Sequence, residues 1–378
     1  MAERQPALRS QSYHADKLRG HAVRMSYARD VEIETKELAV LKSKLGGVPV
    51  KIYFLDNSSK TFVCDRNTTF KSLSVDILRK LGDDNAEGNA RLFGIFQSHN
   101  GVMGVAGAPD QSVADMVISY GDTNLHSEAK KLVFMIRLFT PMLQSMDTPQ
   151  MVHLRYIQAV YDVIINEHTS DPEEVLQLAA IQFVIKFGSA GDHGDREPGF
   201  LGNRIVEFIP ACLMSQKRKE QWETAIFQRC FTHRGKSALD LKREYMRIVQ
   251  HDTIYGCTVF NCKQYIFDEM PEGVRVSICH QGLYVWSTGP FKREPWKEFH
   301  LHDIFRWGYR QDDQFYIEVN PPLPGGSLVP FQCEYGKHVA NLLQDYAMAI
   351  VEEQDLEDEA AEKEKEKEQG VDIELTVE

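Results

Sequence analysis

Residues 274–286, VRVSICHQGLYVW, and residues 337–353, KHVANLLQDYAMAIVEE, decide the fold expected for the C-terminal part of this chain. The first stretch and the residues after it alternate apolar and polar side chains between turn residues, a pattern typical of short strands. We predict the strands Val274–Cys279, Gly282–Trp286, Phe299–Tyr309, Phe315–Val319 and Val329–Glu334. The second stretch has helical spacing and predicts one amphipathic helix, with the apolar face Val339, Leu342, Leu343, Tyr346 and Ile350.

The composition is that of a folded protein with a charged end. The chain has 378 residues, enough for two or three domains with apolar cores, and 43% of them are hydrophobic. Thirteen acidic residues and three lysines follow Val351, so this tail carries −10 of the net charge of −12. The remainder carries only −2, and no basic stripe with interleaved aromatic residues occurs in it. We therefore expect no nucleic-acid partner.

The seven cysteines are scattered and never form a C-x-x-C pair, as expected for reduced thiols in an intracellular protein. No run reaches the roughly 18 apolar residues that span a bilayer. The first residues also lack the apolar segment of a secretion signal. These features predict an intracellular location.

The N-terminal part is expected to combine a basic arm with a mixed lobe of strands and helices. Residues Met1–Arg29 are interpreted as a flexible arm, with an Arg-rich mitochondrial presequence as the alternative, and Val31–Leu45 as a short helix. A strand hairpin begins at Val48, and a helix from Phe70 stops at Gly82. Later elements are the strands Leu92–Phe96 and Leu132–Phe139 and the short helix Val113–Ile118.

From about Pro149 the apolar period becomes helical. Asp171, Pro172 and Glu174 supply the N-cap, the N1 proline and the capping-box acid of a helix. Further helices are expected from Ser215 and from Ser237. This middle part is therefore predicted to be a compact helical bundle.

Six stretches resemble motifs of the FERM domain family, in the family's order. They are VPVKIYFLD at 48–56, ARLFGIFQ at 90–97, PEEVLQLAAIQFVIKFG at 172–188, FIPACL at 208–213, KEQWETAIFQRC at 219–230 and YGCTVFNCKQ at 255–264. The third is similar to the family's Ala-x-Leu-x-Ala-Leu-Gln helix through Leu178, Ala179, Ala180 and Gln182. In the second, Gln97 stands where the family commonly has an acid. The fourth and fifth look most like the FERM lobes of MyTH4–FERM motor tails, in unconventional myosins and plant kinesin-like calmodulin-binding proteins.

The resemblance implies an α+β chain of several lobes packed as a cloverleaf, joined by short links near Thr140–Pro149 and Val259–Gln264. It implies a ubiquitin-like β-grasp lobe at 48–140, a helical lobe like acyl-CoA-binding protein at 141–258, and a PH/PTB-like barrel at 259–353. Residues 1–47 would be the arm and short helix, and residues 354–378 an acidic low-complexity tail. The tail is expected to be either a helical continuation with i,i+4 pairs or a solvated disordered segment. The alternative for the tail is a regulatory element that masks a binding surface. No G-x-x-x-x-G-K-[ST] phosphate loop occurs, and 1–47 is too short for a MyTH4 lobe, so we expect neither motor nor MyTH4.

The function implied by the resemblance is that of a non-catalytic scaffold. It would link the cytoplasmic peptide of a membrane or cargo protein to a cytoskeletal protein. The implied location is the cytoplasm, the cytoskeleton or the inner face of a membrane. The alternatives are a peripheral phosphoinositide-binding module at a membrane and a regulatory subunit of a signalling enzyme. No cofactor is expected.

Two candidate sites follow. PTB-like lobes bind peptides by strand addition, so the resemblance implies a groove between the strand around Trp307 and the C-terminal helix. Its predicted peptide-binding residues are Ile304, Phe305, Trp307, Tyr309, Val339, Leu342, Leu343 and Tyr346. Basic clusters attract anionic headgroups. The predicted lipid-binding residues are Lys217, Arg218, Lys219, Lys292, Arg293 and Lys297.

Three other groupings are interpreted as structural rather than chemical. His300 and His302 alternate on a predicted strand and would share a face, but no third metal ligand is near them in sequence. The group Asp192, His193 and Asp195 is read as a polar loop. Cys230, three residues before His233, is expected to fill the bundle core rather than act as a nucleophile.

Overall fold

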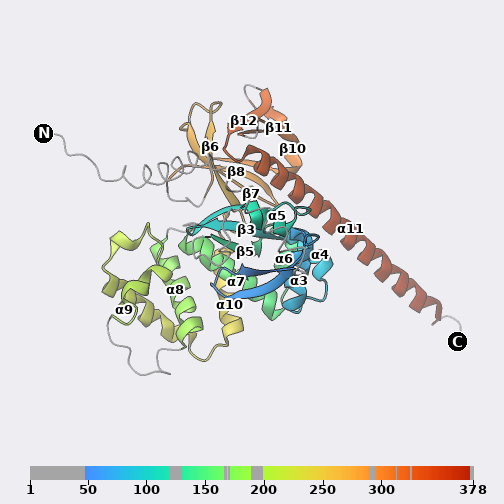
Figure 1. Ribbon diagram of the computed structural model, residues 1–378. Helices are drawn as coiled ribbons and strands as arrows, with labels where there is room; N and C mark the ends of the chain where they lie inside the picture. Colours follow the sequence, from blue (N-terminus) through green and yellow to red (C-terminus); the bar gives the residue numbers. More distant parts are fainter. Residues whose placement is uncertain are drawn as a thin grey trace. The chain divides into compact units, whose positions relative to one another are not determined.

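The computed structural model describes residues 47–119, 130–165, 168, 171–188, 199–289, 294–311, 313–323 and 326–374 (Figure 1). The predicted basic arm and its short helix lie outside these residues, as do Lys292, Arg293 and the loop around His193. The chain divides into two compact units. One comprises Met1–Tyr53, Ser59–Leu73 and Gln97–Val133, and the other Phe54–Ser58, Ser74–Phe96 and Phe134–Glu378.

A five-stranded sheet has the order β2-β1-β5-β3-β4. Its strands are β1 (Val48–Tyr53), β2 (Ser59–Cys64), β3 (Phe93–His99), β4 (Val102–Ala106) and β5 (Lys130–Ile136). Strand β1 pairs antiparallel with β2, from Val48↔Cys64 to Tyr53↔Ser59, and parallel with β5. The predicted hairpin and the two later strands are confirmed. Strand β4 was not predicted, because none of its residues is fully buried and it lacks a clear apolar alternation.

Three helices accompany this sheet: α3 (Phe70–Lys80), α4 (Ala86–Asn89) and α5 (Val113–Ser119). Helix α3 begins where Thr69 and Ser72 exchange bonds, each backbone N–H donating to the other's hydroxyl at 2.9 and 3.1 Å. These bonds satisfy donors that the first turn of a helix leaves free. The predicted helix from Phe70 is therefore confirmed, and so is its end just before Gly82, which has a φ of 83°.

The middle of the second unit is helical: α6 (Pro141–Ser145), α7 (Pro149–Ile164), α8 (Pro172–Phe187), α9 (Lys219–Cys230) and α10 (Ala238–Val249). Asp171 caps α8 by accepting from the N–H groups of Glu173 and Glu174, as predicted. Helix α9 begins at Lys219 rather than at the predicted Ser215, because Met214–Gln216 forms a 3-10 turn and Lys217 is extended. Trp222 and Tyr245 are fully buried and form the apolar centre of this bundle.

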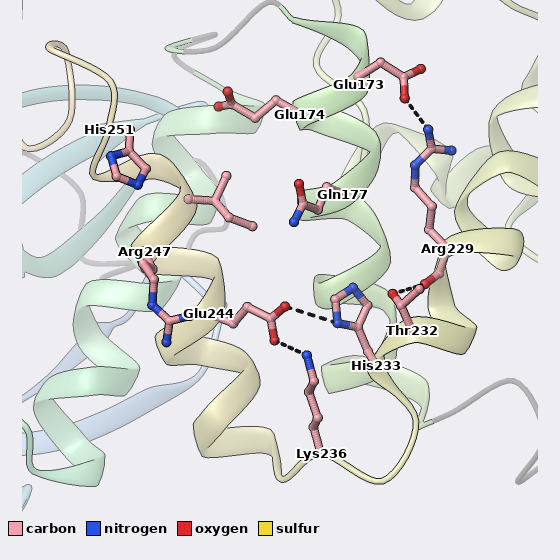
Figure 2. A pocket seen from close by; sticks show the side chains of 11 residues that line it. Glu173, Glu174, Gln177, Arg229, Thr232, His233, Lys236, Glu244, Arg247 and His251 are labelled. Atoms are coloured by element: carbon pink, nitrogen blue, oxygen red, sulfur yellow. Dashed lines mark hydrogen bonds and ion pairs between the residues drawn. The ribbon is translucent and has the colours of Figure 1, made fainter.

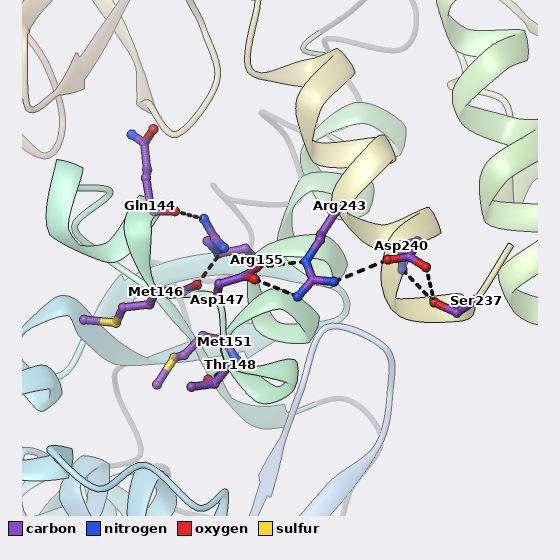
Figure 3. A network of polar contacts seen from close by, with 9 residues as sticks. All are labelled: Gln144, Met146, Asp147, Thr148, Met151, Arg155, Ser237, Asp240 and Arg243. Carbon is purple, nitrogen blue, oxygen red and sulfur yellow. Dashed lines mark hydrogen bonds and ion pairs between the residues drawn. The ribbon is translucent and has the colours of Figure 1, made fainter.

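The connection between α6 and α7 is held by polar contacts (Figure 3). The buried Arg155 of α7 donates to the carbonyl oxygens of Gln144 and, at 2.8 Å, of Met146. Arg243 of α10 donates from two nitrogens to the carboxylate of Asp147, at 2.9 and 2.6 Å. The predicted link Thr140–Pro149 is thus a short helix and a turn that α7 and α10 fix in place.

The C-terminal part contains a seven-stranded sheet of order β10-β11-β12-β6-β7-β8-β9. The strands are β6 (Thr258–Gln264), β7 (Gly273–Cys279), β8 (Gly282–Trp286), β9 (Lys297–His300), β10 (Ile304–Arg310), β11 (Gln314–Leu323) and β12 (Gly326–Gln332). Two expectations are corrected. The predicted single strand Phe299–Tyr309 is two strands, separated by the 3-10 turn Leu301–Asp303. The predicted link Val259–Gln264 lies inside β6, which pairs with β7 and β12.

Helix α11 (Gly336–Glu374) closes this part and continues past Glu353 into the acidic tail, which is the helical one of the two expected alternatives. It packs against β10, β11 and β7. Its first residue, Gly336, has no room for a side chain, because a Cβ there would lie 2.7 Å from the backbone carbonyl carbon of Gln314. No helix in the described ranges is long and apolar enough to cross a bilayer.

Polar contacts join α11 to the chain around α6. The hydroxyl of Tyr346 accepts from the backbone N–H of Phe139 at 3.2 Å, and Glu353 accepts from that of Met142 at 3.1 Å. Asp345 pairs with Arg137. Asp345, Tyr346 and Glu353 therefore hold this part of α11 to the fold.

Candidate peptide-binding edge at strand β10

Strand β10 is an edge of the seven-stranded sheet. Within the described residues it pairs only with β11, antiparallel, from Ile304↔Val319 to Arg310↔Gln314, with a bulge between Ile304 and Arg306. An edge strand presents unpaired N–H and C=O groups, which a further strand can use. The main-chain requirement for peptide addition is met here.

Two aromatic residues of β10 lie on the sheet face that α11 covers. Trp307 is opposite Ile317, and Tyr309 is opposite Phe315, and both partners are fully buried. Opposed residues in a ladder share a face. Trp307 is nonetheless half-buried and Tyr309 is 45% exposed, so α11 leaves the outer margin of this face uncovered.

Lys337 lies on the flank of α11 nearest this margin. Its ammonium lies 5.8 Å from the centre of the Tyr309 ring, within the range of a cation–π contact. Asn341, Gln344 and Met348 follow Lys337 at helical spacing and are all exposed. None of these four residues was predicted to bind a ligand, although their helical spacing already places them on one side of the helix.

The helix residues that were predicted to bind peptide are buried. Val339, Leu343 and Tyr346 have no exposed surface, and Leu342 is nearly as buried. They hold α11 on the sheet, so they do not themselves present a surface to a ligand. Ile304 is likewise buried at the start of β10.

The exposed side of β10 is polar and aromatic. Arg306 donates to the Glu318 carboxylate from Nε at 2.9 Å and from a terminal nitrogen at 2.5 Å. The hydrogen bond that Arg306 donates to Glu318 raises the pKa of Arg306. Phe305, at the bulge, is 60% exposed. The cross-strand pair fixes the strand, and Phe305 remains available to a partner.

The predicted lipid-binding residues occupy two places. The Lys217 ammonium lies 4.6 Å from the Trp222 ring centre, and Lys219 donates to the Asn203 side-chain oxygen at 2.9 Å. Arg218 is exposed at the N-cap of α9. Lys297, on β9, lies over the Phe267 ring. In the described part of the chain, none of these four cations pairs with a carboxylate.

Two of the groupings that were interpreted as structural lie among the described residues. His300 and His302 stack with ring centres 5.5 Å apart, but the expectation that they alternate on one strand is wrong, because His302 lies in the 3-10 turn. No cluster of three metal-type ligands occurs among the described residues. Cys230 is fully buried with its Sγ 3.8 Å from the Ala180 carbonyl oxygen, which confirms its core position.

Comparison with known proteins gives a consistent result. Residues 142–260 match the model of the FERM central domain. FERM domain-containing protein B of Dictyostelium discoideum is 27% identical over 170 residues, which cover 43% of this chain and 34% of that protein. Myosin-VIIa of Drosophila melanogaster is 22% identical over 303 residues, which cover 74% of this chain and 13% of that protein. The chain thus spans about a third or less of the length of these relatives.

Solved structures share the fold. The FERM and C-terminal domain complex of Drosophila merlin aligns with a TM-score of 0.64 at 17% identity, over 82% of this chain and 98% of that one. The C-terminal MyTH4–FERM domain of human myosin 7b, solved in complex with the harmonin-a PDZ3 domain, also aligns with a TM-score of 0.64. Its identity is 16%, over 83% of this chain and 62% of that one. The chain therefore carries a FERM central domain within a FERM-like fold, and the resemblance predicted from its motifs is confirmed.

Proposed function

We propose that this chain is a non-catalytic FERM scaffold that binds an extended peptide along the open edge of β10. The observation that carries the proposal is an edge strand with half-exposed aromatic residues beside the exposed flank of α11. Main-chain pairing supplies affinity in strand addition, and pockets for alternate side chains supply specificity. The proposal keeps the lobe boundaries 48–140, 141–258 and 259–353, with β10 in the third lobe.

The side chains along the edge indicate which kind of peptide would bind there. An apolar or aromatic side chain of the peptide would lie against Trp307 and Tyr309, where the uncovered face is aromatic. An acidic residue next to it would meet Lys337, whose cation borders the same ring. A segment that is extended and apolar with one acid is the expected ligand class.

The partner is proposed to be the cytoplasmic segment of a membrane or cargo protein, linked through the scaffold to a cytoskeletal protein. This is supported by relatives named myosin and by the merlin fold match. The myosin 7b structure shows that a MyTH4–FERM domain of that protein assembles with a PDZ domain.

The test is affinity for an edge-binding peptide selected from a library of extended decapeptides against the full chain. Tyr309→Ala should weaken binding about tenfold or more, since a well-packed aromatic residue at an interface commonly contributes ~2 kcal/mol. Tyr265→Ala is the matched control, because Tyr265 is 63% exposed but follows β6, in the middle of the sheet order. Equal affinities of the wild type and the Tyr309 variant would refute the site.

A phosphoinositide surface is the second candidate. The start of α9 carries Lys217, Arg218 and Lys219 without a carboxylate partner among the described residues. Each basic residue near an anionic surface contributes about 1 kcal/mol. Reversing all three charges should abolish sedimentation of the protein with phosphoinositide vesicles at low salt. If the wild type itself does not sediment with these vesicles, this function is excluded.

A further inference from the structure

A cavity lies in the helical part of the chain, and none of the predicted peptide-binding or lipid-binding residues lines it. It has a volume of about 840 Å³ and is bounded by the first turns of α8, the segment after α9 and the last turns of α10 (Figure 2). Its lining residues are Glu173, Glu174, Gln177, Arg229, Thr232, His233, Lys236, Glu244, Arg247, Ile248 and His251. Cavities that bind small ligands or short peptide segments have this size.

The walls of the cavity are fixed by their own ion pairs. Arg229 pairs with Glu173, and Lys236 donates to the Glu244 carboxylate at 2.6 Å. His233 is only 4% exposed, and its Nδ1 lies 3.5 Å from the other oxygen of Glu244, without a hydrogen bond. Figure 2 shows these contacts as dashed lines on the right and lower sides of the opening. These charges are already neutralised.

Two opposite charges remain. Glu174 is half-buried, and no cation pairs with its carboxylate among the described residues. A carboxylate without a cation favours a ligand that donates an N–H to it. Arg247 is exposed, and in the described part of the chain no carboxylate pairs with it. Its guanidinium is suited to a carboxylate.

Neither a purely anionic nor a purely cationic ligand fits this lining. The three carboxylates would repel the first, and the three cations from Arg and Lys would repel the second. Burial lowers the pKa of His233, so at neutral pH its ring adds no positive charge. A ligand with both charges satisfies both unpaired groups.

We infer that this cavity, which we call the α8–α10 pocket, binds a mixed-charge peptide segment. A basic side chain of the peptide donates to Glu174, and an acidic side chain a few residues away accepts from Arg247. The aliphatic Ile248 lies between the polar walls and contacts the stem of the basic residue. The site is separate from β10, so the scaffold has a second place for a protein partner.

The test uses the full chain and a fluorescent hexapeptide of alternating arginine and aspartate, with binding followed by anisotropy at low ionic strength. Glu174→Gln and Arg247→Gln should each weaken binding tenfold or more, because each removes a charge-assisted hydrogen bond. Glu220→Gln and Arg234→Gln are matched controls, since both residues are exposed on the same helical part but outside the pocket. Thermal melting of all four variants establishes that each is folded.

Three outcomes overturn the inference. The first is no binding of the alternating peptide by the wild type. The second is loss in only one of the two pocket variants, which would indicate a simple anion or cation site. The third is equal loss in the control variants, which would indicate nonspecific attraction. Hexa-arginine and hexa-aspartate peptides should bind without sensitivity to either pocket variant. Failure here leaves the β10 proposal untouched, because no residue is shared.

Discussion

The edge at β10 and the α8–α10 pocket offer two different kinds of recognition. At β10 the main chain is open and the neighbouring side chains are aromatic, with few free charges. In the pocket the main chain is helical and already bonded, and only side-chain charges remain to be satisfied. A strand edge recognises the extended form of a peptide, whereas a charged pocket recognises its side chains. A scaffold with both proposed sites would bind two unlike segments.

The largest expected effect is a loss of stability, which should differ between substitutions on the buried face of α11 and on its exposed flank. Leu343→Ala should lower the free energy of unfolding by about 2–5 kcal/mol, because a fully buried leucine leaves a cavity. Met348 lies on the exposed flank and is 51% exposed, so Met348→Ala should lower the free energy of unfolding by less than about 0.5 kcal/mol. Urea unfolding measures both. Similar values would mean that the flank is also part of the core.

The next effect concerns acid stability and a buried imidazole. Burial lowers the pKa of His168 to about 3. The unfolded chain, with an ordinary histidine pKa near 6.5, then binds more protons, so stability falls as the pH drops below 6.5. Between pH 7 and pH 5 this residue should cost about 2 kcal/mol of unfolding free energy. Burial shifts the pKa of His233 in the same direction.

Urea titrations at pH 7 and pH 5, with His168→Gln beside the wild type, measure this effect. The variant should show a smaller loss on acidification. An unchanged pH dependence would mean that His168 titrates normally. No such pH effect is expected for peptide affinity at β10, whose contacts to Trp307 and Tyr309 involve no imidazole.

Salt distinguishes the two sites in binding. Ion pairs at exposed groups weaken as the Debye length falls from about 10 Å at 0.1 M to about 3 Å at 1 M salt. Binding in the pocket should therefore weaken several-fold over this range, and binding at β10, where main-chain bonds and aromatic contacts dominate, by less than about twofold. Calorimetric titration at several salt concentrations gives both slopes. An equal dependence of affinity on salt at the two sites would contradict this difference between them.

The smallest expected effect concerns thiol labelling. Six cysteines are buried, whereas Cys212, in the helical part, is half-buried. The hydrogen bond with Cys279 and, after it, burial raise the pKa of Cys257 and so suppress its reactive thiolate. A brief treatment of the native chain with iodoacetamide should therefore modify Cys212 first, as read by mass spectrometry. Early labelling of a cysteine in the seven-stranded sheet would show that this sheet opens more readily than the helical part.

Local signals made much of the fold predictable. The capping residue and the N1 proline of α8 set its start by contacts within four residues. Strand β7 alternates half-buried and buried residues from Gly273 to Val276, and every residue of β8 is buried, so their apolar patterns reflect their burial. The break at Leu301–Asp303 has no such signal. It contains no glycine or proline, and the Leu301 N–H bonds to the distant Gln281 carbonyl at 2.8 Å. Wrapping of the sheet, a tertiary effect, imposes the turn.

The candidate sites were predicted unevenly for similar reasons. The apolar stripe of α11 was interpreted as a groove wall, but such a stripe first serves to bury the helix, as Leu343 and Tyr346 do. Lys337 and Met348, on the exposed flank, follow from the same periodicity one face away. The α8–α10 pocket was not predictable, since Glu174 and Arg247 are brought together only by the packing of the helices.

Amide hydrogen exchange along β10, with and without a selected edge-binding peptide, tests the central claim most directly. Strand addition predicts that outward-facing amides of β10 exchange freely in the unliganded chain and become protected when the peptide is bound. Amides of β9, the opposite edge of the same sheet, should not change. A peptide that binds tightly while β10 stays unprotected would contradict the account.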